Sequence, residues 1–158
     1  MAKRYDVIVV GAGMAGLTAA IYTARANKKT LVLEGKTHGG QIVSTMKVAN
    51  YPGLPGVSGP ELMEKIYQQV VDFGVEMKYE TVLEIIDGNT KCVKTDEGEY
   101  EAKAVILAVG AEDSEMEISR EEELTGRGVS YCATCDGALY KGKSVIVVGG
   151  GNSALYET

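Results

Sequence analysis

The order of apolar and polar residues at the start of the chain predicts a strand, a helix and a second strand. Tyr5–Val10 is a short, nearly continuous apolar run that ends at a glycine, as expected for a strand buried on both faces. Apolar residues then recur at helical spacing from Met14 to about Asn27. Thr30–Leu33 is a second apolar run, which ends at Glu34-Gly35. These segments have the length of one βαβ unit, whose two strands are parallel.

The pattern changes in the middle of the chain. Residues 35–59 are rich in Gly and Pro and have little periodicity, which indicates a binding loop, because structureless loops of this length are uncommon. Ser58 and Glu61 match a capping box, and the helix that they start is expected to end at Gly74.

From residue 75 to residue 109 the apolar spacing shortens to that of strands. Turn residues at 87–89 and 96–98 predict a small antiparallel meander, and residues 104–109 are expected to return to the main sheet as a buried strand. Residues 144–148 then start a second strand-glycine-helix unit. The expected fold class is α/β, with a parallel sheet, a small meander and the start of a second domain of the same kind.

Composition fits a globular protein and argues against two kinds of partner. The chain has 158 residues, of which 45% are hydrophobic, and its net charge of −6 does not suit a nucleic-acid surface. No stretch approaches the roughly 20 apolar residues of a membrane span. Met1–Arg4 leads into a strand without the apolar core of a signal peptide. We therefore expect a cytoplasmic protein that binds neither nucleic acid nor membrane.

The negative charge is concentrated between Glu112 and Glu123, where there are seven carboxylates and one arginine. Such a run is usually a solvated face or an exposed connection, and a docking patch for a basic partner is the alternative. We predict that residues 112–123 connect a first domain, residues 1–111, to a second that starts at residue 124 and runs to residue 158.

Gly11, Gly13 and Gly16 form a Gly-x-Gly-x-x-Gly motif between a predicted strand and a predicted helix. In this context the first glycine allows a tight turn, the second lets the backbone approach a pyrophosphate, and the third lets helix and strand pack closely. The helix N-terminus offers unpaired N–H groups to the phosphates. Glu34 can bind the adenosine ribose and would repel a 2′-phosphate, so the motif predicts FAD or NAD rather than NADP.

A second glycine motif lies near the end of the chain. Gly149, Gly151 and Ala154 keep the spacing, and alanine is tolerated at the third position. The following strand, whose end distinguishes NAD from NADP, lies beyond Thr158, so this motif does not choose between them.

Two cysteines separated by two residues, Cys132 and Cys135, lie between the glycine motifs. Such a pair forms a disulfide that exchanges through thiolate attack. Inert buried cysteines are one alternative. Zinc is another, but it needs more ligands, and the chain adds only Cys92, expected in the core, and His38, expected in a loop. We predict a redox pair and no metal; Asp136 is either its acid–base or a turn residue.

Together these motifs resemble the low-molecular-weight thioredoxin reductases, the flavoprotein type of bacteria and archaea. The resemblance covers the whole chain and rests on GAGMAGLTAAIYTARA, GGQI, ANYPG, GRGVSYCATCDG and VIVVGGGNSAL. It implies a Rossmann-like FAD-binding domain followed by the start of a Rossmann-like NAD(P)-binding domain that carries the cysteines. Family members are roughly twice this length, consistent with two domains.

The resemblance implies that NADPH reduces FAD, that the flavin reduces the Cys132–Cys135 disulfide, and that the dithiol reduces thioredoxin or a thioredoxin-like protein. Cys135 would face the flavin, Cys132 would attack the partner's disulfide, and Asp136 would be the acid–base. A rotation between domains would be required, because a disulfide pressed against the flavin cannot also reach a protein. The full-length enzyme is expected to be a homodimer.

The positions that match cofactor contacts in relatives form two sets. The FAD set is Gly11, Gly13, Gly16, Glu34, Gly40, Gln41, Asn50 and Gly110, with Val82 meeting the adenine through its backbone. The NAD(P) set is Gly149, Gly151, Asn152, Ser153 and Ala154.

Three departures from the family pattern keep other functions open. Val109 stands where relatives usually carry Thr, an acidic segment replaces one with Arg, Pro and Gly, and Asn152, Tyr156 and Thr158 replace Asp, Glu and Ala. The alternative enzyme is a ferredoxin- or deazaflavin-dependent flavin thioredoxin reductase. The alternative outside enzymes is a non-catalytic FAD-binding fragment, because the chain stops at Thr158.

Overall fold

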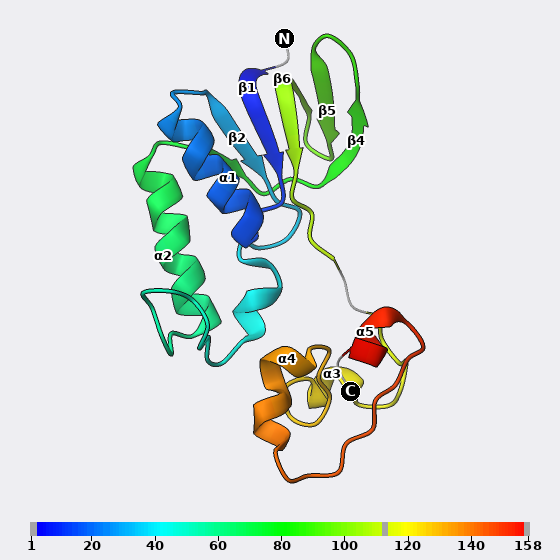
Figure 1. Cartoon of the computed structure of the whole chain (residues 1–158). Helices are drawn as coiled ribbons and strands as arrows, with labels where there is room; N and C mark the ends of the chain where they lie inside the picture. The colour runs from blue at the N-terminus through cyan, green and yellow to red at the C-terminus, as the bar shows by residue number, and fades with distance from the viewer. Residues whose placement is uncertain (1–2, 112–113, 157–158) are drawn as a thin grey trace. The chain divides into compact units, whose positions relative to one another are not determined.

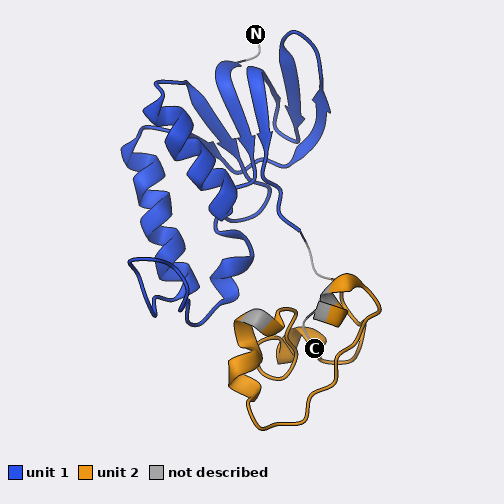
Figure 2. Ribbon diagram, viewed as in Figure 1, with its two compact units in different colours: residues 1–111 blue, residues 112–158 orange. Residues whose placement is uncertain are grey.

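The computed structural model describes residues 3–111 and 114–156, and the chain divides into two compact units (Figure 2). Unit 1 comprises residues 1–111 and unit 2 comprises residues 112–158. No helix in the described part of the chain has both the length and the apolar character needed to cross a bilayer.

Unit 1 is a six-stranded sheet with two helices packed on one face (Figure 1). The strand order is β3-β2-β1-β6-β5-β4, in which β3, β2, β1 and β6 are parallel and β6, β5 and β4 are antiparallel. The elements are β1 (Lys3–Val10), α1 (Met14–Arg25), β2 (Thr30–Leu33), the 3-10 helix η1 (Gly40–Ser44), α2 (Gly59–Asp72), β3 (Glu76–Lys78), β4 (Val82–Ile86), β5 (Lys91–Thr95) and β6 (Glu99–Leu107).

The predicted βαβ unit and the predicted capping box are both confirmed. β2 covers the predicted residues, and it pairs with β1 in parallel. At the start of α2 the Glu61 N–H donates to the Ser58 hydroxyl oxygen at 3.3 Å, and the Ser58 N–H donates to the Glu61 carboxylate at 3.1 Å. Each hydrogen bond thereby satisfies a backbone N–H group that has no partner within the helix.

Two predictions for residues 75–109 were wrong in detail. The final strand is not a separate segment that starts at residue 104, because β6 starts at Glu99 and belongs to both parts of the sheet. One edge of β6 pairs with β5 and the other pairs with β1, so one long strand supplies partners to both. In addition, β3 pairs with β2 in parallel and is not part of the meander.

Residues 7–10 of β1 and residues 31–33 of β2 are apolar because both faces of the sheet are covered there. Val9 and Val32 pack with Leu17, Leu62 and other residues of α1 and α2. The neighbouring side chains point to the opposite face, where Ile8, Val10, Leu31 and Leu33 pack with Val93, Tyr100 and Ala102 of the meander. Continuous apolar runs in β1 and β2 follow from this double burial.

A buried polar cluster joins β3, β5 and β6. Glu80, only 7% exposed, accepts hydrogen bonds from Lys78 Nζ, from the Thr95 hydroxyl and from the Tyr100 hydroxyl. These donors hold the pKa of Glu80 below its usual value, although burial acts in the opposite direction. The cluster also fixes the chain directly before Val82, where β4 starts.

Unit 2 contains short helices and no strand among its described residues. Its elements are α3 (Glu121–Leu124), α4 (Ala133–Asp136), the 3-10 helix η2 (Gly137–Tyr140) and α5 (Asn152–Tyr156). The strand predicted for residues 144–148 is not formed, because a parallel strand needs neighbours and residues 114–156 provide none. Val145, Ile146 and Val148 are 62%, 90% and 65% exposed.

Candidate functional site

Two of the three glycines in the first motif are required by packing within the chain. A Cβ atom on Gly11, whose φ is +101°, would lie 2.3 Å from the Ala108 carbonyl oxygen. A Cβ atom on Gly16 would lie 1.9 Å from the Gly11 carbonyl oxygen. Both distances are far below any tolerable contact, so α1 can approach the glycine turn and β6 only if these residues have no side chain.

Gly13 has no such reason within the chain. Its φ of −77° suits any residue, and a Cβ atom there would meet only the Gly40 Cα, at 3.9 Å. Gly13 is the N-cap of α1, no side chain caps the helix, and its first turn carries no acidic residue. The first N–H groups of α1 therefore lack both a capping side chain and a carboxylate from their own turn. Together with the open space beside Gly13, this helix start fits an anionic group such as a pyrophosphate.

Glu34 lies beside this turn, as the sequence predicts. One carboxylate oxygen accepts a hydrogen bond from the Ala12 N–H at 2.8 Å, and the other accepts one from the Lys36 N–H at 3.1 Å. The carboxylate is thus held at the C-terminal end of β2, next to the space at Gly13. At that place it can accept hydrogen bonds from ribose hydroxyls.

Residues 39–41 form a second wall of the same site. The Gly39 N–H donates to the Ala12 carbonyl at 2.8 Å, and a Cβ on Gly40 would lie 3.3 Å from the Gly13 Cα. Gln41 Nε2 donates to the Ala111 carbonyl at 2.6 Å, which ties the loop to the segment after β6. The structure therefore brings Gly13, Gly40 and Gln41 together with Gly110, which precedes Ala111.

The other two predicted FAD contacts are Asn50 and Val82. Asn50 lies on the exposed surface of the loop that follows η1. Val82 starts β4, and the preceding residue, Thr81, lies next to Gly35, because a Cβ added to Gly35 would meet the Thr81 hydroxyl oxygen at 3.4 Å. Val82 therefore directly follows the residue that lies next to the Glu34-Gly35 turn.

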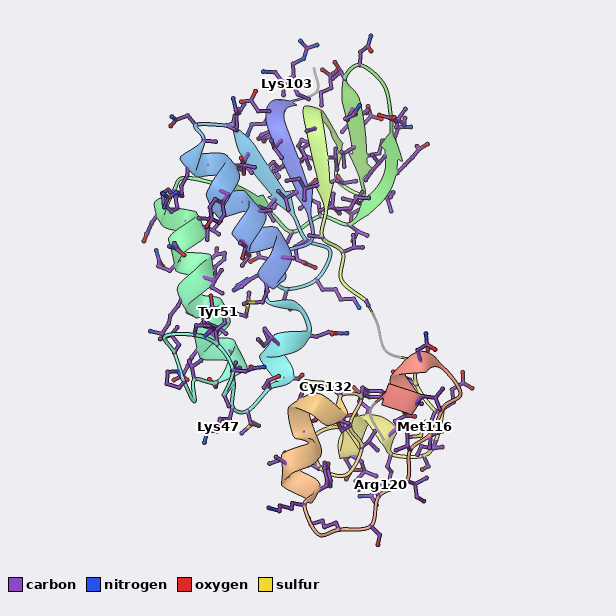
Figure 3. All side chains as sticks on the ribbon, viewed as in Figure 1. Lys47, Tyr51, Lys103, Met116, Arg120 and Cys132 are labelled. Carbon is purple, nitrogen blue, oxygen red and sulfur yellow. A yellow bond between two sulfur atoms is a disulfide. The ribbon has the colours of Figure 1, made fainter. Side chains whose placement is uncertain are left out.

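In unit 2, Cys132 and Cys135 form a disulfide with an S–S distance of 2.07 Å and a Cα–Cα distance of 5.3 Å. Cys132 is the N-cap of α4 and is labelled in Figure 3. The Cys135 N–H approaches Cys132 Sγ at 3.2 Å, and the Asp136 N–H donates to the Cys132 carbonyl at 3.0 Å. Cys135 is exposed and Cys132 is half-buried, so α4 presents the disulfide at the surface of the unit.

Ser130 connects the disulfide turn to Asp136. Its hydroxyl donates to the Asp136 carboxylate at 2.8 Å, and the Cys132 N–H donates to the same hydroxyl at 3.2 Å. Ser130 is not among the site residues predicted from the sequence. The available signal was its spacing, because serine hydroxyls often bond the backbone two residues further along the chain.

Among the described residues of the acidic segment, 114–123, one carboxylate is buried. Glu121 is only 6% exposed, and it accepts hydrogen bonds from the Met116 and Ile118 N–H groups and from the Tyr131 hydroxyl. The Met116 N–H and then the Tyr131 hydroxyl hold the pKa of Glu121 below its usual value. Because Tyr131 precedes Cys132, this buried carboxylate anchors the start of the disulfide turn.

We expect this anchor to weaken in acid. The pKa of Glu121 is lower in the folded chain than its unfolded value of 4.5, so its contribution to stability is complete above pH 4.5. That contribution is lost as the pH falls through the folded pKa. Hydrogen-exchange protection of the Met116 and Ile118 amides should therefore stay constant from pH 6 to about pH 5 and fall as the pH is lowered below 4.5.

Glu121→Gln tests the same anchor at neutral pH. An amide side chain cannot accept three hydrogen bonds without turning its own donors toward other donors, so protection of the two amides should already be low at pH 6. The exposed neighbour Glu122→Gln is the matched control and should keep wild-type protection. Equal protection in wild type and Glu121→Gln at pH 6 would contradict the anchoring role.

The second glycine motif forms a turn before α5. A Cβ on Gly149 would lie 3.4 Å from the Ala154 Cβ, an ordinary contact, and Gly151 has open space around it. Asn152 is the first residue of α5. The side chain of Ser153 lies outside the described part of the chain.

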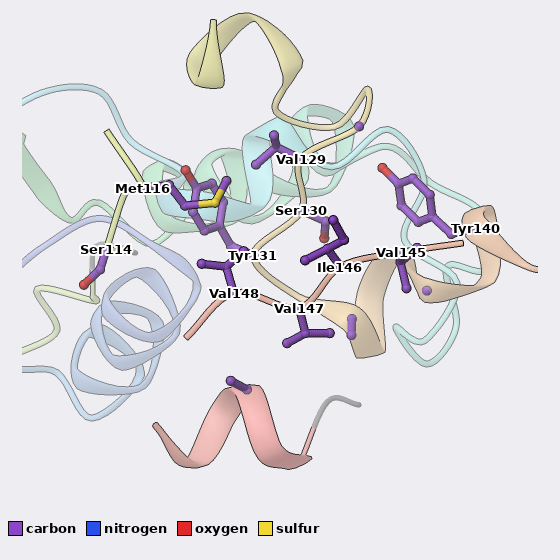
Figure 4. Close-up of a pocket in the computed structure, with 14 residues that line it drawn as sticks. Ser114, Met116, Val129, Ser130, Tyr131, Tyr140, Val145, Ile146, Val147 and Val148 are labelled. Carbon is purple, nitrogen blue, oxygen red and sulfur yellow. The ribbon is translucent and has the colours of Figure 1, made fainter. Parts of the chain in front are cut away.

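Ala154 and the disulfide turn line one cavity of about 420 Å³ within unit 2 (Figure 4). Ser130 and Tyr131 line it from the turn, and the extended segment 145–148 supplies an apolar wall. Figure 4 shows Met116, Tyr131 and Val148 toward one end of the cavity and Tyr140 and Val145 toward the other. The structure thus brings part of the predicted nicotinamide motif close to the cysteine turn.

Comparison with known proteins identifies the family. The sequence profile of the pyridine nucleotide-disulphide oxidoreductases matches residues 5–157. Over 156 residues the chain is 53% identical to the thioredoxin reductase of Bacillus subtilis, and the match covers 98% of this chain and 49% of that protein. It is 48% identical to the bifunctional thioredoxin reductase/thioredoxin of Mycobacterium leprae, with 97% of this chain and 34% of that protein covered.

Comparison with solved structures also finds thioredoxin reductases. A crystal structure of thioredoxin reductase from Streptococcus pyogenes matches with a TM-score of 0.92 and 45% identity, over 99% of this chain and 52% of that one. The chain spans about half the length of the B. subtilis and S. pyogenes proteins. By profile, sequence and structure, the chain belongs to the pyridine nucleotide-disulphide oxidoreductase family, in its thioredoxin reductase branch.

Proposed function

We propose that this chain is the FAD-binding and disulfide-bearing part of a thioredoxin-disulfide reductase. The observation that carries the proposal is the Cys132–Cys135 disulfide, held beside Asp136, in a chain whose first unit has a glycine turn with open space at Gly13. Electrons would pass from NADPH through FAD to this disulfide and then to thioredoxin or a thioredoxin-like protein. The name of the M. leprae relative, in which reductase and thioredoxin are one protein, supports this partner.

In the proposed site, α1 and the turn at Gly13 hold the pyrophosphate of FAD, and Glu34 holds the adenosine ribose. Gly40, Gln41 and Gly110 line the same end of the sheet, and Asn50 and Val82 complete the set. Bound FAD supplies two electrons at a time, which a disulfide needs for reduction. The turn at Gly149 and Gly151, with Asn152, Ser153 and Ala154, is proposed to bind the nicotinamide dinucleotide.

The protein's own residues then perform a thiol–disulfide exchange. Reduction gives the Cys132–Cys135 pair two electrons and two protons. The Cys132 thiolate attacks the partner's disulfide and forms a mixed disulfide, and one partner thiolate leaves and takes a proton. Asp136 accepts the proton of Cys135, whose thiolate attacks Cys132 and expels the second partner thiolate. The second partner thiolate takes that proton from Asp136, the partner leaves as a dithiol, and the Cys132–Cys135 disulfide is restored.

The proposal extends to the complete enzyme. Residues 1–111 would be the first part of the flavin domain, residues 112–123 the connection, and residues 124–158 the start of the nicotinamide domain. The enzyme would be a cytoplasmic homodimer whose domains rotate, since one disulfide must meet the flavin and the protein partner in turn.

The decisive experiment uses purified enzyme that contains this chain. A yellow protein with a flavin absorption band is expected, together with bleaching of that band by NADPH without oxygen and reduction of thioredoxin with NADPH as donor. A colourless protein would overturn FAD binding, and a yellow protein that reduces no thioredoxin with any donor would favour the non-catalytic FAD-binding fragment. A flavoprotein that neither NADPH nor NADH bleaches would overturn the nicotinamide donor and favour ferredoxin or a deazaflavin.

A further inference from the structure

We propose that Ser130 is a positioning residue for thiol–disulfide exchange, because it holds the Asp136 carboxylate in place beside the Cys132–Cys135 turn. This inference rests on the proposed function, in which Asp136 takes the proton of Cys135. The described hydrogen bonds of the Ser130 hydroxyl join it to the Asp136 carboxylate and to the backbone of Cys132, so it would act through Asp136.

The direction of the hydrogen bonds supports this role. The Ser130 hydroxyl has one proton and two possible acceptors, the Asp136 carboxylate at 2.8 Å and the Cys132 carbonyl at 3.3 Å. The shorter contact and the charged acceptor both favour the carboxylate. The oxygen lone pairs remain free to accept the Cys132 N–H, at 3.2 Å.

One hydroxyl therefore bridges the two ends of the cysteine turn. Cys132 starts the turn and Asp136 ends α4, and Ser130 is hydrogen-bonded to both. The Asp136 N–H also donates to the Cys132 carbonyl, which fixes the backbone of Asp136 but leaves its side chain free to rotate. Of the side-chain hydrogen bonds described for unit 2, the one from Ser130 is the contact that orients this carboxylate.

The exposed location of Ser130 indicates that its side chain can be replaced without loss of the fold. Ser130 is exposed, and it lines the cavity next to Tyr131 (Figure 4). The disulfide turn is anchored independently through Tyr131 and the buried carboxylate of Glu121. Removal of the Ser130 hydroxyl should therefore release the Asp136 side chain without unfolding the turn.

The test is the oxidation of the reduced chain by the small aromatic disulfide DTNB, which requires no flavin, nicotinamide or thioredoxin. Every variant carries Cys92→Ala, so that Cys132 and Cys135 are the two remaining thiols. Cys132 first attacks DTNB and releases one thionitrobenzoate. Cys135 then loses its proton to Asp136, attacks Cys132 and releases the second thionitrobenzoate. Stopped-flow absorbance with limiting DTNB separates the two phases.

We expect Ser130→Ala to slow the second phase by about tenfold, the effect of losing one hydrogen bond to a charged group. Asp136→Asn should slow it by about 100-fold. In the Asp136→Asn background, Ser130→Ala should have no further effect, because the two residues act as one unit. Ser130→Thr, which keeps the hydroxyl, should restore the wild-type rate, and the exposed Ser144→Ala should leave it unchanged.

The outcomes separate the two claims. If Asp136→Asn reacts at the wild-type rate, the acid–base assignment in the proposed function fails. If Asp136→Asn is slow but Ser130→Ala is not, the positioning role of Ser130 fails while the proposed function stands. If the two effects are fully additive, Ser130 acts on the turn alone, which also overturns the inference. Circular dichroism melting curves of all variants serve as the control for folding, and each variant is expected to melt as the wild type does.

Discussion

Replacement of Gly13 by alanine is expected to weaken FAD binding while the chain keeps its fold. A Cβ atom there would find no protein atom closer than the Gly40 Cα at 3.9 Å, and the φ of −77° is ordinary for alanine. The added methyl group would instead occupy the space proposed for the pyrophosphate. Forcing a methyl group into a packed contact costs about 1–3 kcal/mol, so the Kd for FAD should rise by about fivefold to 150-fold.

Gly16→Ala is the matched comparison, with the opposite expected result. Its Cβ would lie 1.9 Å from the Gly11 carbonyl oxygen, so α1 would have to move away from the turn. We expect a loss of about 3 kcal/mol or more in the free energy of unfolding, at the upper end for overpacking. Urea unfolding followed by circular dichroism measures stability, and quenching of flavin fluorescence on titration measures binding.

The two variants together decide why the motif contains glycine. If Gly13→Ala binds FAD as tightly as the wild type, the space beside Gly13 does not hold the pyrophosphate. If Gly13→Ala unfolds instead, the glycine is required by the packing of the chain and does not indicate a bound pyrophosphate.

The parts of the fold that follow from local sequence could be predicted. The β1–α1–β2 unit needed only the period of the apolar residues and the glycine turn, and β2 starts and ends where predicted. The capping box at Ser58 was visible for the same reason, because both of its hydrogen bonds join residues three apart. The placement of Glu34 beside the turn also followed, since parallel strands end at the same edge of a sheet.

Other features depend on contacts between segments that are distant in sequence. That β6 serves both the meander and the parallel sheet was not visible, because its two partners lie far apart along the chain. The segment 145–148 has the composition of a buried strand, yet a strand requires a neighbour as well as apolar side chains. Its exposed valines and isoleucine therefore remain outside any sheet.

The cysteine turn shows the same limit. The sequence indicated a redox pair with Asp136 beside it, and the structure contains the disulfide. The residues that hold the turn were not predicted. Glu121 belongs to a run whose composition indicates a solvated segment, but its carboxylate is buried by backbone donors that composition does not reveal. Charge patterns describe a segment as a whole, whereas burial is decided residue by residue.

Cys132→Ser and Cys135→Ser should separate the roles of the two sulfurs in the complete enzyme. Cys132→Ser removes the proposed attacking thiolate, so thioredoxin reduction should fall by more than about 1,000-fold, while NADPH still bleaches the flavin. Cys135→Ser keeps that thiolate but removes the thiol that resolves the mixed disulfide. It should therefore accumulate a covalent complex with thioredoxin, which non-reducing electrophoresis and mass spectrometry detect.

The comparison works because the two sulfurs occupy different positions on the same short helix. Cys132 is its N-cap, where the Cys135 N–H approaches the sulfur, and Cys135 lies within the first turn. An N–H group that points at Cys132 Sγ would also stabilise a thiolate there, which suits the attacking sulfur. If Cys132→Ser traps the complex and Cys135→Ser does not, the assignments must be exchanged, and the proton that Asp136 accepts would come from Cys132.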